Sequence, residues 1–170
     1  ILSVGIGIGA NTAIFSMVNA LALRKAPIDR PQEVVDIYKS MPDFAYGPFS
    51  FPDVRDLERE TTDVFSGVSG FRLAIAQVDL GGSFEPVTGE LVTGNYFTLL
   101  GIRPQLGRTL LPSDDVARGA HPVVVLSHEY WQRRYAGDPR VVGQEIRINA
   151  RPYTIVGIAP REYRGGLRVM

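Results

Sequence analysis

The chain has 170 residues, enough for one domain of ordinary size with a hydrophobic core. Its 18 basic and 18 acidic side chains cancel, so no net positive field favours a nucleic-acid partner. The absence of cysteine excludes disulfide scaffolds and thiol-based catalytic or metal sites. With 18 glycines and 12 prolines, we expect short elements and many turns.

The first 23 residues carry no charged side chain, whereas residues 24–170 carry all of them. A helix of that length spans roughly 35 Å at about 1.5 Å per residue, enough to cross a hydrocarbon core about 30 Å thick. Gly5, Gly7 and Gly9 would weaken a soluble helix, but in a membrane they permit close helix contact. We therefore predict that residues 1–24 form the C-terminal part of a transmembrane helix and that the chain is a piece of a longer protein.

Three alternatives for this segment are weaker. Gly5, Gly7 and Ala10 match the G-x-G-x-x-A spacing of a dinucleotide-binding turn. That fold also needs a complete strand before the turn and an amphipathic helix after it, and residues 12–23 lack a polar face. A signal peptide is the second alternative, but its apolar region would be too long and no clear cleavage site precedes the domain. A buried helix of a soluble protein is the third.

In chain order, residues 24–33 predict a stiff link, residues 33–40 a strand, residues 41–49 a loop and residues 50–60 a helix. Pro52 suits the first turn of that helix. Apolar residues on one side of the helix predict a buried stripe.

Residues 71–80 and 84–94 predict paired strands around a turn at residues 81–82, where two glycines stand together. Residues 95–102 predict a short helix, which Asn95 would cap at its N-terminus and a glycine would end.

Residues 107–115 predict a loop, residues 122–127 a buried strand and residues 128–137 a helix capped by the last residue of that strand. Residues 144–158 predict a hairpin with its turn at residues 150–151. This order of elements predicts an α+β fold, a small mixed sheet with helices on one face.

No set of residues predicts a catalytic, cofactor-binding or metal site. His121 and His128 have no metal-site spacing, and we expect them at the surface or at a helix terminus. Asp114 and Asp115 are neighbours in a loop and predict a solvated turn, not a pair of facing carboxylates. Ser127 is better explained as a helix cap than as a nucleophile, because no G-x-S-x-G elbow surrounds it.

The aromatic residues of the helix at 128–137 suggest one more possibility. Tyr130, Trp131 and Tyr135 share this helix with two arginines, a composition that can bind single-stranded nucleic acid. Because the chain has no net charge, we expect these rings in the core and at its rim. With no catalytic set, the domain is expected to bind, couple or transmit, not to act as an enzyme.

Several stretches together resemble one family. GIGANTAIFSMVNALALRKAP resembles the end of the first membrane helix in permease subunits of MacB/FtsX-like ABC transporters. SFPDVRDLE, VTGNYFTLLGIRPQLGRTL and HPVVVLSHEYWQRRYAGDPRVVGQEIRINARPYTIVGIAP resemble the MacB-like periplasmic core domain that follows it. The resemblance assigns residues 1–24 to the membrane helix and residues 32–170 to a truncated core domain.

The resemblance implies a protein of the bacterial inner membrane with its main domain on the periplasmic side. Such permeases couple ATP hydrolysis by a separate cytoplasmic subunit to movement of the periplasmic domain, which exports or extracts a substrate. The implied partners are that ATP-binding subunit, a second copy or a paralogous permease, and a periplasmic adaptor or lipoprotein. The alternative is a regulator or scaffold that switches a periplasmic enzyme. Arg24 and Lys25 would by themselves favour the cytoplasmic side, and we follow the family order instead.

Overall fold

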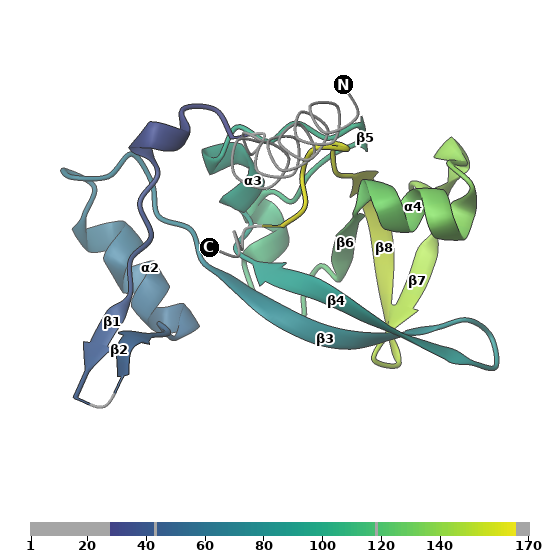
Figure 1. Ribbon diagram of the computed structural model, residues 1–170, viewed down its shortest axis with the longest axis horizontal. Coiled ribbons are helices and arrows are strands. Elements are labelled where there is room, and N and C mark those ends of the chain that lie inside the picture. Colours follow the sequence, from purple (N-terminus) through teal and green to yellow (C-terminus); the bar gives the residue numbers. More distant parts are fainter. Residues whose placement is uncertain (1–27, 43, 118, 166–170) are drawn as a thin grey trace, which may run out of the picture.

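The computed structural model describes residues 28–42, 44–117 and 119–165, which form an α+β fold (Figure 1). The predicted membrane helix, residues 1–24, lies outside these ranges. Within them, no helix has both the length and the apolar character needed to cross a bilayer.

The described elements are three α-helices, three short 3-10 helices and eight strands. The α-helices are α2 (Phe51–Glu60), α3 (Tyr96–Leu99) and α4 (His128–Tyr135). The 3-10 helices are η1 (Pro31–Glu33), η2 (Pro112–Asp115) and η3 (Pro139–Val141). The strands are β1 (Lys39–Met41), β2 (Phe44–Gly47), β3 (Phe71–Asp79), β4 (Phe84–Val92), β5 (Leu106–Gly107), β6 (Val123–Leu126), β7 (Glu145–Ile148) and β8 (Arg151–Ile158).

These strands form two sheets. β1 and β2 pair antiparallel as a small sheet, and the other six form a mixed sheet in the order β4-β3-β7-β8-β5. β6 also pairs with β8, in the parallel direction. The predicted mixed sheet and α+β class are therefore confirmed.

The region of the small sheet corrects two predictions. The strand predicted at residues 33–40 is wrong over most of its length, because only residues 39–40 belong to β1. Residues 34–38 are extended and exposed but pair with no described strand, so β-propensity alone did not place them in a sheet. The loop predicted at residues 41–49 is also wrong, because it contains β2, the hairpin partner of β1.

Helix α2 begins where the sequence predicts. The Asp53 amide donates to Ser50 Oγ at 3.3 Å, and the Ser50 amide donates to the Asp53 carboxylate at 3.0 Å. This capping box satisfies two backbone donors of the first turn. Lys39 Nζ lies 3.9 Å from the Asp53 carboxylate, which joins α2 to β1. Since α2 lies with the small sheet, the prediction of all helices on one sheet face is wrong for this helix (Figure 1).

Two hairpins supply most of the larger sheet. β3 and β4 form a long curved ribbon in Figure 1, paired from Phe71 opposite Val92 to Asp79 opposite Phe84. Gly81 and Gly82, with φ of 77° and 128°, make its turn as predicted, in a conformation that other residues rarely adopt.

The second hairpin turns one residue earlier than predicted. Asn149 and Ala150, with φ of 50° and 64°, form the turn between β7 and β8. The Asn149 amide donates to the Gln77 carbonyl at 2.8 Å, and the Gln77 amide donates to Asn149 Oδ1 at 2.8 Å. This exchange with β3 fixes Asn149 in the turn.

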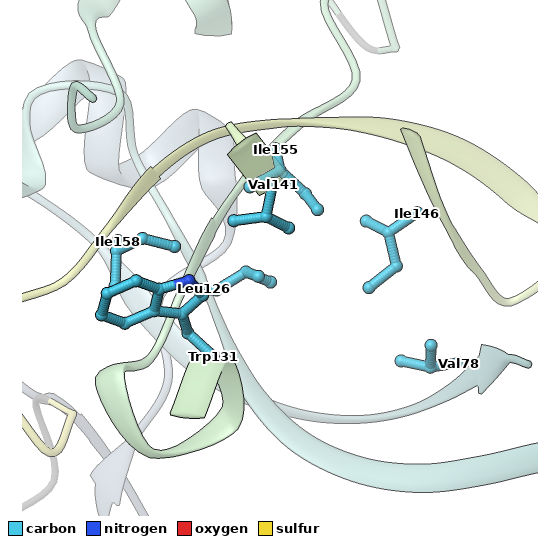
Figure 2. Close-up of a cluster of buried hydrophobic side chains, with 7 residues drawn as sticks. All are labelled: Val78, Leu126, Trp131, Val141, Ile146, Ile155 and Ile158. Atoms are coloured by element: carbon cyan, nitrogen blue, oxygen red, sulfur yellow. The ribbon is translucent and has the colours of Figure 1, made fainter. Parts of the chain in front are cut away.

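The main hydrophobic core lies between α4 and the larger sheet (Figure 2). Its seven buried residues are Val78, Leu126, Trp131, Val141, Ile146, Ile155 and Ile158. The predicted cap of α4 is confirmed, because the Tyr130 amide donates to Ser127 Oγ at 3.1 Å. Trp131 is 7% exposed, and its indole N–H donates to the Asp138 carbonyl at 2.9 Å, which holds the end of α4 against the chain that follows.

An irregularity in β8 completes this core. Val124 of β6 lies opposite Ile155, but Val125 lies opposite Gly157, so β8 has one extra residue at Val156. Such a bulge changes which side the following side chains face. It explains how Ile155 and Ile158, three residues apart, are both fully buried in the same cluster.

We expect Ile155→Ala to lower the free energy of unfolding by about 2–5 kcal/mol, since it leaves a cavity in a fully buried site. Trp131 is the only tryptophan of the chain and lies in the same cluster, so its fluorescence should report the denaturant transition. The exposed Ile75 provides the control, and Ile75→Ala should change stability by less than about 0.5 kcal/mol. Equal losses for the two variants would contradict this assignment of the core.

Candidate coupling junction

The described residues contain no catalytic arrangement. His121 is exposed, and His128 Nδ1 lies 2.7 Å from Gln105 Oε1 in the first turn of α4, so the two histidines lie at the surface and at a helix terminus as predicted. Within the described ranges, no three His, Cys, Asp or Glu side chains lie close enough together to hold a metal ion. Tyr130 and Tyr135 pack against the core cluster, as predicted for aromatic residues of the core and its rim.

A hollow of about 310 Å³ opens where the end of β3, the end of α4 and β7 meet. Two arginines and two carboxylates line it, and one of these pairs, Arg147 and Asp79, is 3.8 Å apart.

Asp114 and Asp115 are not a solvated turn, which corrects the sequence prediction. The Asp114 side chain is only 11% exposed and accepts from Arg108 Nη1 and Nη2 at 2.6 and 3.0 Å. The Leu111 amide donates to the same carboxylate at 2.9 Å. The Arg108 hydrogen bonds hold the pKa of Asp114 below its ordinary value. Asp114 therefore fixes the loop between β5 and η2.

Asp115 faces the other way, towards α2. Arg55 Nη2 donates to the Asp115 carbonyl at 3.2 Å and to its carboxylate at 3.4 Å, while the Gly94 amide donates to the same carboxylate at 3.3 Å. Arg55 Nη1 also donates to Glu58 at 3.1 Å on its own helix. The two carboxylates thus have separate structural roles, and Asp115 joins three segments of the chain.

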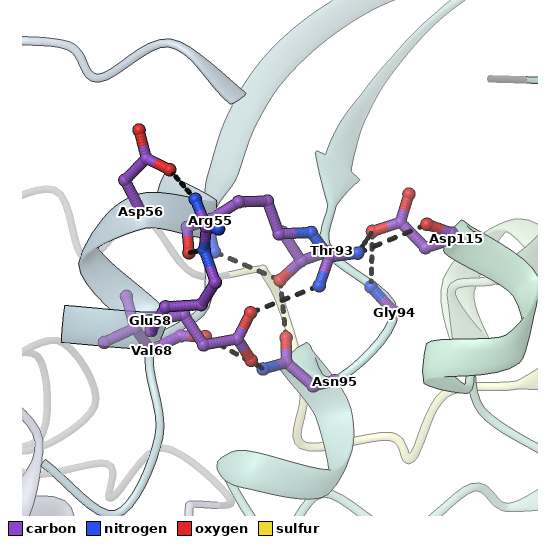
Figure 3. Close-up of polar contacts among 10 residues, drawn as sticks. Arg55, Asp56, Glu58, Val68, Thr93, Gly94, Asn95 and Asp115 are labelled. Carbon is purple, nitrogen blue, oxygen red and sulfur yellow. Dashed lines mark hydrogen bonds and ion pairs between the residues drawn. The ribbon is translucent and has the colours of Figure 1, made fainter. Parts of the chain in front are cut away.

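Asn95 is the second residue at which these segments meet (Figure 3). Its amide nitrogen donates to Glu58 Oε1 at 3.1 Å and to the Val68 carbonyl at 2.8 Å. Its amide oxygen accepts from the Thr93 hydroxyl at 2.7 Å, and that hydroxyl in turn accepts from the Gly70 amide at 3.1 Å. Asn95 precedes α3, but its side chain caps no amide of the helix, so the predicted cap is wrong.

We call this network the coupling junction, defined as Arg55 and Glu58 of α2, Thr93, Gly94 and Asn95 between β4 and α3, and Asp115 of η2. At Gly94 the backbone leaves no room for a side chain. A Cβ there would lie 2.4 Å from the Leu111 carbonyl oxygen, so glycine is required where these two backbone segments touch. Arg55 and Asp115 keep side-chain exposures of 40% and 30%, so each contact alone stabilises little.

Sequence reasoning missed the junction. Arg55 and Glu58 were visible only as a possible i,i+3 pair on one helix. Their other partners, Asp115 and Asn95, lie 60 and 37 residues further along the chain. No local pattern indicates such distant contacts.

The fold and the junction define an extended two-sheet α+β domain whose shared polar network joins its parts and resembles no catalytic centre. The sequence model of the MacB-like periplasmic core domain matches residues 1–169. Because the match covers nearly the whole chain, the chain belongs to the MacB-like periplasmic core domain family. A search among curated proteins finds no match.

Two solved structures are similar to this chain. One is the periplasmic region of MacB from Actinobacillus actinomycetemcomitans, with a TM-score of 0.56, 18% identity, and coverage of 68% of this chain and 52% of that chain. The other is the extracellular domain of the noncanonic ABC-type transporter YknZ from Gram-positive bacteria, with a TM-score of 0.54, 15% identity, and coverage of 70% and 59%. Identities this low support the fold alone. The chain spans little more than half of either structure.

We expect Asn95→Ala to lower the free energy of unfolding by about 1–3 kcal/mol, because it removes the donor to the Val68 carbonyl and to Glu58 Oε1. A double-mutant cycle with Glu58→Ala, which removes the acceptor of the Asn95 hydrogen bond, should give a coupling energy of about 1 kcal/mol, measured by denaturant unfolding. Glu60 is an exposed carboxylate on the same helix, and a cycle of Asn95→Ala with Glu60→Ala should show no coupling. Additive effects in both cycles would contradict the junction.

Asp114 should make stability depend on pH. Its folded pKa is lowered, and the unfolded pKa is about 3.9, so its stabilisation is complete above about pH 4 and is lost as pH falls through the folded value. We expect Asp114→Asn to lose about 1 kcal/mol at pH 7, because the partly exposed Arg108 loses a charged acceptor. In unfolding measurements the gap between the two proteins should close as the pH falls below the folded pKa of Asp114. A gap that stays constant from pH 7 to pH 2 would indicate a steric effect instead.

Proposed function

We propose that this chain is part of a permease subunit of a MacB-like ABC transporter. In this proposal residues 1–24 are the end of the first transmembrane helix, and residues 32–170 belong to the core domain on the outer side of the inner membrane. The observation that carries the proposal is the family match, which runs from residue 1 to residue 169 and so includes the apolar segment and the domain together.

The subunit would act by coupling. A separate cytoplasmic ATP-binding subunit would hydrolyse ATP, and movement would pass through the membrane helices into this domain for export or extraction of a substrate. The permease would pair with a second copy or a paralogue, and a periplasmic adaptor or lipoprotein would be a further partner. The coupling junction supports this role, because it joins α2, the turn before α3 and η2 through side chains at an exposed boundary.

A regulator of a periplasmic enzyme would use the same movement without cargo. Purification of the complex separates the two functions. A bound adaptor or outer-membrane channel supports export, whereas a bound hydrolase supports regulation. Neither function requires a nucleotide site in this chain, and binding of NAD or NADP at millimolar concentration would contradict both.

The orientation of the domain can be tested directly. We expect alkaline phosphatase fused just after Pro31 to be active in cells, because the enzyme folds only outside the cytoplasm. Green fluorescent protein fused at the same position and exported through the same route should be dark. The matched control places both reporters before the apolar segment in the full-length chain, where the two signals should reverse. A cytoplasmic signal just after Pro31 would contradict the proposed function.

A further inference from the structure

Both ends of the described chain contact one small cluster. The cluster consists of four buried residues from α3 and the turn after it, Tyr96, Phe97, Leu100 and Ile102, each 3–7% exposed. Two half-buried residues from opposite ends of the chain, Ile28 and Tyr163, pack against it. Two segments separated by more than 130 residues therefore pack against the same buried cluster.

The N-terminal segment is attached at the C-terminal end of α3. The Asp29 amide donates to the Leu100 carbonyl at 3.0 Å. Asp29 also lies against Gly101, where an added Cβ would be 2.6 Å from Asp29 Cβ. A carbonyl at a helix C-terminus lacks a partner within the helix, and Asp29 supplies one from outside.

The C-terminal segment is attached at the other end of α3. The Tyr163 hydroxyl donates to Glu90 Oε2 at 2.9 Å and lies 3.3 Å from the Tyr96 hydroxyl. Its ring centroid is 5.6 Å from that of Phe97. Burial raises the pKa of Tyr163, so its phenol stays protonated and remains a donor. The Tyr96 hydroxyl can then donate to Tyr163 while Tyr163 donates to the carboxylate.

The helix between these attachments is short and stiff. α3 has four residues, and the rings of Tyr96 and Phe97 pack edge to face at 5.5 Å. Buried, close-packed side chains move together and not separately. A displacement imposed at Leu100 should therefore also displace Tyr96.

We propose that α3 is a coupling element that joins the N-terminal segment at Asp29 to the C-terminal segment at Tyr163, so that loosening one attachment loosens the other. This inference deepens the proposed function and rests on it, because the N-terminal segment is the part that would continue from the membrane helix. Asn95, directly before α3, connects the same element to Glu58 of α2.

Hydrogen exchange in the full-length protein tests this coupling. Tyr163→Phe keeps the aromatic ring but removes the hydroxyl that donates to Glu90. We expect hydrogen exchange at the Asp29 amide to become about fivefold faster, which corresponds to the loss of one hydrogen bond. Tyr130→Phe is the matched control, because the Tyr130 hydroxyl is buried in the other core cluster and has no hydrogen-bond partner among the described residues. This control should leave Asp29 exchange unchanged.

The reverse experiment must agree, because coupling between two sites is reciprocal. Ile28→Ala weakens the N-terminal attachment and should speed exchange at the Tyr163 amide, which donates to the Pro160 carbonyl at 3.0 Å. If each variant changes exchange only in its own segment, or in neither, α3 does not couple them. These measurements need no ATP and no cargo. A failed orientation test with intact reciprocal exchange would therefore overturn the proposed function and leave the coupling standing.

Discussion

The fold depends on one strand, β8, with which three others pair. β7 runs antiparallel to its first half, β6 runs parallel to its second half, and β5 pairs with its last residues. The extra residue at Val156 lets both Ile155 and Ile158 reach the core, where Trp131 covers them. At Gly157 an added Cβ would be 2.1 Å from the Arg108 carbonyl oxygen, so only glycine lets the β5 chain approach. The sheet, the position of α4 and the loop to η2 all follow from this strand.

The small sheet is joined to this framework in a different way. Among the described strands, none of the small sheet pairs with a strand of the larger one, so the connection of α2 relies on the coupling junction. Contacts between half-exposed charged side chains are individually weak and sensitive to salt. Such a boundary can rearrange at a lower free energy than the buried core around Ile155 can open. The buried clusters lie with the larger sheet and α3, and α2 has no fully buried residue. This polar boundary is therefore the place where movement of α2 relative to the larger sheet would cost least.

Local signals in the sequence predicted local structure well. Ser127 caps its helix, and the two glycines at residues 81–82 turn the long hairpin. Prediction failed where distant partners decide the outcome. Residues 34–38 have strand-forming side chains but no described strand to pair with, and Asn95 bonds to residues 37 and 27 positions earlier instead of capping its own helix. The coupling junction consists of such distant contacts, so the sequence did not predict it. The family resemblance could be identified from the sequence because its motifs are contiguous stretches of residues.

A domain that transmits movement needs stiff parts joined by contacts that can yield. The α3 cluster supplies the stiff part, with side chains 3–7% exposed, and the junction beside it supplies the yielding part, with Arg55 40% exposed. Asn95 stands between them, since it leads directly into α3 and bonds to Glu58 of α2. A shift of the N-terminal segment would reach α2 through this residue without disturbing the core around Ile155. A change in the relation of the two sheets would then leave the packing around Ile155 intact.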